Sequence, residues 1–161
     1  MILVLHGQPG SGKTTLARAF MEQYYKTLTT SYKDFFHIDG DMLRTATRNA
    51  SYEPQDRRRN CLSANDIALY AFQMGFYPVV SMVHPYREIR DRLKHMAPTR
   101  VCFVELSYDP AYFSRGKEDR WVDGYEHAED AMDTIHIDTG LVSIHEAAHR
   151  VYMHVSVNNW E

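Results

Sequence analysis

The chain has 161 residues, of which 44% are hydrophobic and 12% aromatic, enough to form one domain with a sizeable core. Its 18 basic and 21 acidic residues give a formal net charge of -3, which excludes a general attraction to nucleic acids or anionic membranes. No apolar run approaches the roughly 20 residues that span a bilayer, and the two cysteines form no CxxC pair.

These bulk properties predict a single domain over residues 1–161, with reduced cysteines and a cytoplasmic location. The opening apolar stretch is too short and too uncharged for a signal peptide. Binding to nucleic acid or to a membrane is not expected. The histidines lack an HExxH arrangement, so no zinc site is predicted.

Five short apolar runs alternate with five segments of helical periodicity. The apolar runs, taken as strands, cover residues 2–6, 34–39, 77–83, 101–106 and 134–137. The helical segments cover residues 13–26, 41–48, 56–74, 85–96 and 141–154. Continuous apolar strands that alternate with helices are typical of a parallel sheet covered on both faces. The sequence therefore predicts an α/β fold with a five-stranded, mainly parallel sheet.

Residues 107–133 fit neither the strand nor the helix periodicity, and they carry many acids together with Arg115, Lys117 and Arg120. A polar segment of this length between two strands is typical of a functional loop outside the sheet. We expect a short, partly helical lid here.

A glycine-rich loop of the form GxxxxGK[ST] follows the first predicted strand and precedes the first predicted helix. Its residues are Gly7, Gln8, Pro9, Gly10, Ser11, Gly12, Lys13 and Thr14, and Thr15 follows them. Backbone N–H groups of such a loop converge on phosphate oxygens. Lys13 suits the β- and γ-phosphates, and Thr14 offers a hydroxyl to Mg²⁺. The loop predicts a site for ATP with Mg²⁺.

Switch GTPases, ATP-driven motors and small-molecule kinases share this loop. A guanine-reading N-K-x-D is absent after the last predicted strand, and the run over residues 77–83 does not end in a carboxylate. Acids instead follow the run over residues 34–39, where Asp39 and Asp41 flank a glycine. Parallel-sheet geometry places such a strand end beside the phosphate loop. This arrangement favours a kinase.

The two acids are assigned different roles. Asp39 is predicted to bind the metal together with Thr14, and Asp41 to accept the proton of an acceptor hydroxyl. The alternative for Asp41 is that it only caps the helix that follows. Which of the two acids is the base stays open at this stage.

In chain order, these motifs resemble the adenylylsulfate kinase family, which transfers the ATP γ-phosphate to the 3′-hydroxyl of adenosine 5′-phosphosulfate (APS). The resemblance covers residues 1 to about 110. Residues 39–44 (DGDMLR) correspond to the family's D-G-D-N-[VI]-R. Residues 52–60 correspond to F-[ST]-x-x-D-R-x-E-N, and residues 81–87 to S-F-I-[SA]-P-Y-R.

The resemblance implies a small-molecule nucleotide substrate held in an acceptor pocket. The implied acceptor-binding residues are Asp41, Arg44, Tyr52, Arg57, Asn60, Val83 and Trp121. Arg44 and Arg57 would bind the anionic tail bidentately, and Tyr52 and Trp121 would stack on the adenine. Arg115 would contact ATP from the lid. Family members often dimerise, which implies a homodimer.

The chain departs from the family pattern at three positions and in the lid. Met42 replaces an Asn, Arg59 replaces a Glu, and His84, which we interpret as structural, replaces a small residue. The lid is abbreviated. Two alternatives therefore stay open: a kinase for another hydroxyl acceptor, such as a nucleoside, modified base, polynucleotide end or small metabolite, and a non-catalytic nucleotide-sensing module.

Overall fold

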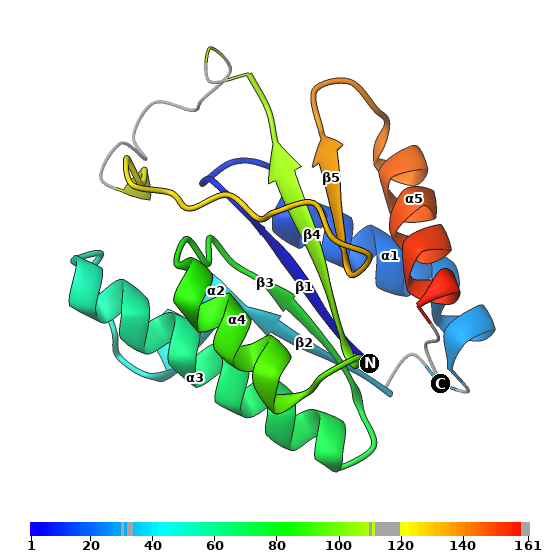
Figure 1. Cartoon of the computed structure of the whole chain (residues 1–161), viewed down its shortest axis with the longest axis horizontal. Helices are drawn as coiled ribbons and strands as arrows, with labels where there is room; N and C mark the ends of the chain where they lie inside the picture. The colour runs from blue at the N-terminus through cyan, green and yellow to red at the C-terminus, as the bar shows by residue number, and fades with distance from the viewer. Residues whose placement is uncertain (30, 32–33, 110, 112–119, 159–161) are drawn as a thin grey trace.

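The computed structural model describes residues 1–29, 31, 34–109, 111 and 120–158. Its centre is a five-stranded sheet in the order β2-β3-β1-β4-β5, in which every neighbouring pair is parallel (Figure 1). The strands are β1 (Ile2–Gly7), β2 (Phe35–Asp39), β3 (Tyr77–Ser81), β4 (Val101–Ser107) and β5 (Thr134–Asp138). The predicted α/β fold and its five strands are confirmed.

Helices cover both faces of this sheet, as predicted. They are α1 (Lys13–Leu28), α2 (Gly40–Ala46), α3 (Pro54–Gln73), α4 (Arg87–Met96) and α5 (Ile144–Val157). Helices α1 and α5 lie on one face, and α2, α3 and α4 lie on the other (Figure 1). Successive residues of a strand therefore face different helical layers, which is why β1, β3 and β4 are buried along almost their whole length.

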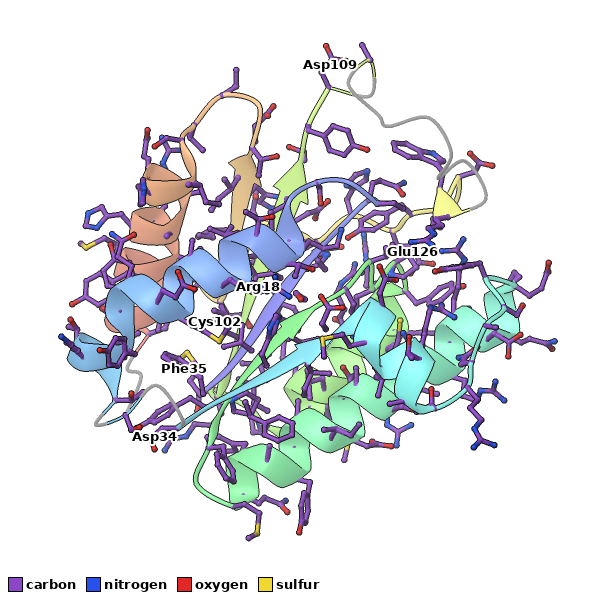
Figure 2. All side chains as sticks on the ribbon, turned by 180° about the vertical axis from the view of Figure 1, so that it is seen from behind. Arg18, Asp34, Phe35, Cys102, Asp109 and Glu126 are labelled. Carbon is purple, nitrogen blue, oxygen red and sulfur yellow. The ribbon has the colours of Figure 1, made fainter. Side chains whose placement is uncertain are left out.

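Two clusters of buried side chains form the core, one on each face of the sheet. Because successive side chains of a strand point to opposite faces, Leu3 and Leu5 pack toward α1 and α5, and Val4 packs toward α3 and α4. Phe35 and Cys102 lie in the layer between the sheet and α1 (Figure 2). Packing on both faces holds the carboxyl edge of the sheet, where β1, β2 and β3 end, as a rigid platform.

Several predicted element boundaries were wrong by two or three residues. The strand expected over residues 77–83 ends at Ser81, and His84 then turns the chain with φ 48. The helix expected from residue 85 begins at Arg87, since Tyr86 before it is extended. The last helix begins only at Ile144, because the Ser143 side chain accepts a hydrogen bond from the Glu146 N–H and caps it.

The segment after β4 was predicted as a partly helical lid over residues 107–133. Its start was wrong, because Ser107 still pairs with Asp138 in the sheet. Arg115 and Lys117 fall on residues 112–119, which lie outside the described residues, and the described residues of 107–133 contain no α-helix. Residues 120–133, here called the return segment, lead back to β5 on the α4 side of the sheet (Figure 1).

Two buried groups hold the return segment onto the sheet. The Glu105 carboxylate on β4 contacts His127 Nδ1 and accepts a hydrogen bond of 2.7 Å from the Ala128 N–H. Arg90 on α4 donates to the backbone carbonyls of His84 and Glu126.

No helix in the described part of the chain combines the length and apolar character needed to cross a bilayer.

Candidate active site

The glycine-rich loop joins β1 to α1 in the predicted place. Gly12 has φ 86, a left-handed conformation that glycine adopts without strain, and α1 begins at the next residue. The Lys13 ammonium folds back over the loop and donates to the Gln8 carbonyl at 2.7 Å and to Ser11 Oγ at 3.2 Å. The loop therefore surrounds a cation at the amino end of a helix, an arrangement suited to an anion.

Asp39, at the end of β2, is the N-cap of α2. Its Oδ1 accepts hydrogen bonds from the N–H groups of Asp41 and Met42, at 3.0 and 3.1 Å. The suggestion that Asp41 caps this helix was therefore wrong, because α2 starts one residue earlier than expected. Gly40 permits this start: a Cβ there would lie 2.7 Å from the Met82 Cβ on the neighbouring chain segment.

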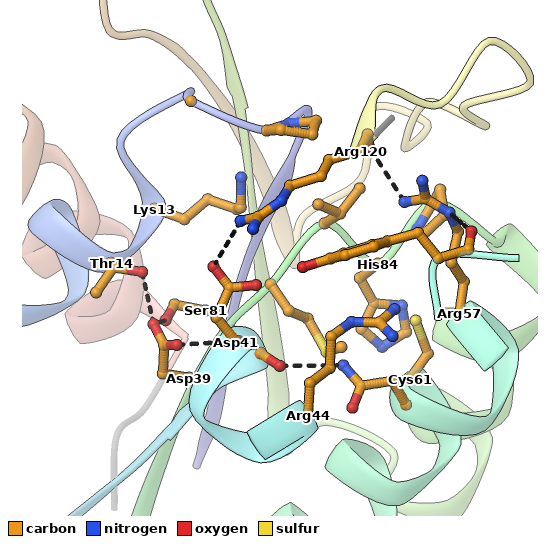
Figure 3. Close-up of a pocket in the computed structure, with 18 of the residues that line it drawn as sticks. Lys13, Thr14, Asp39, Asp41, Arg44, Arg57, Cys61, Ser81, His84 and Arg120 are labelled. Atoms are coloured by element: carbon orange, nitrogen blue, oxygen red, sulfur yellow. Dashed lines mark hydrogen bonds and ion pairs between the residues drawn. The ribbon is translucent and has the colours of Figure 1, made fainter. Parts of the chain in front are cut away.

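The other oxygen of Asp39 faces the glycine-rich loop. Thr14 Oγ1 donates to Asp39 Oδ2 at 2.6 Å, and Ser81 Oγ lies 3.3 Å from the same oxygen (Figure 3). Burial raises the pKa of Asp39, but the hydrogen bonds from Thr14, Met42 and Asp41 outweigh it and hold the pKa below its usual value. Asp39 is therefore a carboxylate at neutral pH, fixed beside a hydroxyl.

Asp41 presents its carboxylate quite differently. Its side chain is 71% exposed, and its Oδ2 lies 3.6 Å from Arg120 Nη1 of the return segment (Figure 3). Asp39, by contrast, uses both oxygens to hold backbone and hydroxyl groups. Of these two carboxylates, Asp41 is thus the one with room to receive a proton from a bound molecule.

These groups line one cavity of about 380 Å³. Its lining residues are Pro9, Gly10, Gly12, Lys13, Thr14, Thr15, Asp39, Gly40, Asp41, Arg44, Tyr52, Arg57, Asn60, Cys61, Ser81, Met82, Val83, His84, Pro85 and Arg120. Four of these described side chains are cationic and two are acidic, in a chain with a formal net charge of -3. The cavity is thus a local basic site that suits an anionic molecule.

The far end of the cavity is built around the Tyr52 ring. The guanidinium carbons of Arg44, Arg57 and Arg120 lie 4.5, 5.3 and 5.1 Å from the ring centroid. Two of these arginines also shape the chain locally: Arg44 Nη1 donates to the Ser51 carbonyl at 2.6 Å, and Arg57 Nε donates to the Tyr52 carbonyl at 2.5 Å. The arginines are therefore pre-positioned around an aromatic face.

Most of the sequence-predicted residues come together in this cavity, and a few do not. Gly7, Gln8 and Ser11 belong to the loop but do not line the cavity among the described residues, and neither does Trp121. Arg115 lies outside the described residues. Sequence reasoning had assigned no role to Ser81, although its position at a strand end next to that of Asp39 could have indicated one.

His84 lies at the base of the cavity and is completely buried. Its Nε2 lies 2.9 Å from Asn65 Oδ1, and because Asn65 Nδ2 donates to the Ile89 carbonyl, this oxygen accepts and Nε2 carries the hydrogen. Burial, assisted by the Arg90 guanidinium, lowers the pKa of His84 to about 3. These contacts fit the structural interpretation of His84, which holds a neutral ring under the cavity.

The buried histidine predicts a loss of stability in acid. The unfolded chain takes up this proton near pH 6.5 and the folded chain only near pH 3, so the contribution is complete above pH 6.5 and is lost as the pH falls. For His84→Ala we expect the unfolding free energy to fall less steeply between pH 6 and 4, by about 1.4 kcal/mol per pH unit. Urea unfolding measures this, with exposed His145→Ala as the control. Equal slopes for wild type and His84→Ala would contradict the prediction.

Comparison with known proteins agrees with this geometry. The profile of the family described as adenylylsulphate kinase matches residues 1–156. The chain belongs to the adenylylsulphate kinase family. The family resemblance seen in the sequence is thus confirmed by a match over most of the chain.

Two curated relatives of this chain in the adenylylsulphate kinase family are named as kinases for different substrates. Adenylyl-sulfate kinase 1 of Arabidopsis thaliana is 30% identical over 109 residues, which is 67% of this chain and 38% of that protein. Cytidine diphosphoramidate kinase of Campylobacter jejuni is 32% identical over 90 residues, which is 56% of this chain and 51% of that protein. The chain thus matches only about two fifths to half of the length of these relatives.

A solved structure supports the fold. The APS kinase of Mycobacterium tuberculosis, in complex with AMPPNP and APS, aligns with a TM-score of 0.76 at 18% identity and covers 96% of both chains. This likeness extends through residues beyond the motifs described above. At this level of identity it shows a shared fold.

Proposed function

We propose that this chain is an ATP-dependent kinase that transfers the ATP γ-phosphate to the 3′-hydroxyl of APS. The observation that carries the proposal is a single cavity with a phosphate-binding loop at one end and an arginine-lined aromatic face at the other. A carboxylate, Asp41, lies between these two ends. A donor and an acceptor nucleotide can therefore meet across one carboxylate, as phosphoryl transfer requires.

In this proposal ATP lies against the loop that precedes α1. The backbone N–H groups of the loop bind phosphate oxygens, and the Lys13 ammonium exchanges its contact with the Gln8 carbonyl for the β- and γ-phosphates. The AMPPNP in the M. tuberculosis structure, an analogue of ATP, supports ATP as the donor.

The pair of Thr14 and Asp39 fits a Mg²⁺ ion. Both residues offer oxygen, which Mg²⁺ prefers, and the lowered pKa of Asp39 keeps it negatively charged. These two residues would hold the ion together with phosphate oxygens and water. When bound, Mg²⁺ supplies charge neutralisation to the triphosphate.

Transfer proceeds by one displacement. The acceptor hydroxyl oxygen bonds to the γ-phosphorus, the bond to the β–γ bridging oxygen breaks, and ADP leaves. The hydroxyl proton passes to Asp41, whose exposed carboxylate lies between the two ends of the cavity. Lys13 stabilises the charge on the group in transfer.

Tyr52 supports a nucleotide acceptor, because its ring lines the cavity and the guanidinium groups that lie over the ring can bind an anionic tail. For Tyr52→Ala we expect the acceptor KM to rise about tenfold to a hundredfold, the value of one base stack. The conservative control, Tyr52→Phe, keeps the ring and should stay near the wild-type KM. Steady-state kinetics with varied acceptor measure both, and an unchanged KM for Tyr52→Ala argues against a stacked base.

A second candidate acceptor is a cytidine nucleotide. Among the positions that depart from the family pattern, His84 lines the cavity, whereas Met42 is 66% exposed and does not line it. An imidazole in place of a small side chain leaves less room for a base, which favours a pyrimidine over a purine. The relative named cytidine diphosphoramidate kinase supports the same alternative.

One assay separates these functions. ATP consumption is measured with APS, cytidine diphosphoramidate, nucleosides and 5′-hydroxyl oligonucleotides as separate acceptors. Stimulation by APS alone supports the main proposal, and stimulation by the cytidine compound alone supports the second. ATP binding without consumption on any acceptor supports a nucleotide-sensing module and overturns both.

A further inference from the structure

The side chain of Gln8, in the glycine-rich loop, binds the return segment rather than the cavity. Its Nε2 donates to the Val122 carbonyl at 2.7 Å, and its Oε1 accepts from the Val122 N–H at 3.1 Å. One planar amide therefore satisfies both backbone groups of a residue that lies 114 positions away. This pair of hydrogen bonds is here called the amide clamp.

The return segment is held from the opposite side of the cavity as well. Arg57 on α3 is only 8% exposed, and its Nη1 donates to the Arg120 carbonyl at 3.1 Å. Residues 120–122 are thus fixed at one end to the acceptor side through Arg57 and at the other to the phosphate loop through Gln8. A backbone held at both ends gives the side chain of its first residue a defined origin.

That side chain is Arg120, which extends across the cavity toward Asp41 (Figure 3). Its guanidinium lies 3.6 Å from Asp41 Oδ2 and 5.1 Å from the Tyr52 ring centroid. Arg120 therefore reaches both groups to which the proposed function assigns the acceptor. The Arg120 side chain is 37% exposed, and the hydrogen bond from Arg57 Nη1 to its own carbonyl helps to fix where it starts.

We propose that Gln8 is a positioning residue, whose amide clamp on Val122 holds Arg120 over the acceptor side of the cavity. The expected effect on kinetics rests on the proposed function. The expected effect on the position of the return segment rests on the contacts alone. The backbone carbonyl of Gln8 also accepts a hydrogen bond from the Lys13 ammonium. One loop residue thus links the cation at the donor end with the cation at the acceptor end.

Two substitutions of matched size test the clamp. Gln8→Leu keeps the volume and removes both hydrogen bonds, and Gln8→Glu keeps only the acceptor for the Val122 N–H. We expect the acceptor KM to rise about tenfold for Gln8→Leu, as for the loss of paired hydrogen bonds, and less for Gln8→Glu. The dissociation constant of ATP should change less than the acceptor KM. A wild-type acceptor KM for Gln8→Leu would mean that the side chain only fills space, which overturns the proposal.

A double-mutant cycle tests whether Gln8 acts through Arg120. If Gln8 only positions Arg120, Gln8→Leu adds nothing to the acceptor KM once Arg120→Ala has removed the guanidinium. The single and double variants that contain Arg120→Ala should then agree within about twofold. Effects that multiply instead would show that the two residues act independently, and the positioning role would be lost.

Trp121 provides a readout that needs no catalysis. The chain has two tryptophans, so Trp160→Phe leaves Trp121, next to the clamp, as the only one. In this background we expect Gln8→Leu to increase acrylamide quenching of Trp121. Urea unfolding checks that the variant is still folded under the conditions of the quenching measurement. Unchanged quenching in a folded variant contradicts the clamp. If no acceptor is phosphorylated but quenching still rises, the proposed function fails and the clamp stands.

Discussion

Lys13→Ala is expected to lower turnover by about a thousandfold or more, the largest effect at this site. Lys13 is the first residue of α1, and its ammonium lies over the glycine-rich loop, beside the backbone groups that we propose bind phosphate. Removing it leaves the charge that develops on the γ-phosphate without its nearest cation. Turnover of ATP with saturating acceptor measures the effect.

Lys26→Ala is the matched control for this measurement. Lys26 is exposed near the other end of the same helix, so its loss makes the same change in net charge away from the cavity. We expect near wild-type turnover. Lys13→Arg tests geometry, because a planar guanidinium keeps the charge but not the point-like ammonium, and we expect it to restore little. Wild-type turnover for Lys13→Ala would remove the phosphate loop from the mechanism.

Asp41→Asn is expected to lower kcat about a hundredfold to ten-thousandfold, the usual contribution of a positioned general base. The amide keeps the shape of the side chain but cannot accept the hydroxyl proton. Because Asp41 is exposed and caps no helix, the folded state should be little affected. Single-turnover measurements separate this chemical step from binding, and ATP affinity should stay near the wild-type value.

The comparison with Asp39→Asn assigns the two carboxylates. Asp39 caps α2 and binds Thr14, so its substitution should lower both the unfolding free energy and the affinity for Mg·ATP. Asp66→Asn, at an exposed position of α3, serves as the neutral control. A larger kcat loss for Asp39→Asn than for Asp41→Asn, with Mg·ATP saturating, would assign the base to Asp39 instead.

Local patterns predicted much of the fold, because a buried strand or helix requires apolar residues at a spacing that is characteristic of that element. The apolar runs identified all five described strands, since helices pack on both faces of the sheet and bury most of its strand residues. Boundaries were less predictable. The last helix starts at Ile144 and not at residue 141, because the Ser143 side chain caps it, and the apolar periodicity of the sequence does not locate a cap.

The candidate site was predictable to the extent that it is made of contiguous motifs. The glycine-rich loop and the pair Asp39 and Asp41 can be recognised from a few consecutive residues. This is possible because glycine conformations and helix starts are local properties. The sequence predicted the metal for Asp39 and the proton for Asp41 but left open which is the base, because the different surroundings of the two carboxylates were not predictable. It depends on Thr14 and Ser81, which reach Asp39 from two other elements.

The sequence by itself determined the family, the phosphate loop and the residues that gather at the carboxyl edge of the sheet. Only the tertiary structure decided how Gln8 reaches Val122 and how Arg120 comes to face Asp41. The physical reason is that periodicity records how deeply a residue is buried but not which distant segment packs against it. Contacts across 114 positions are chosen by the packing of the whole chain, and no local pattern encodes them.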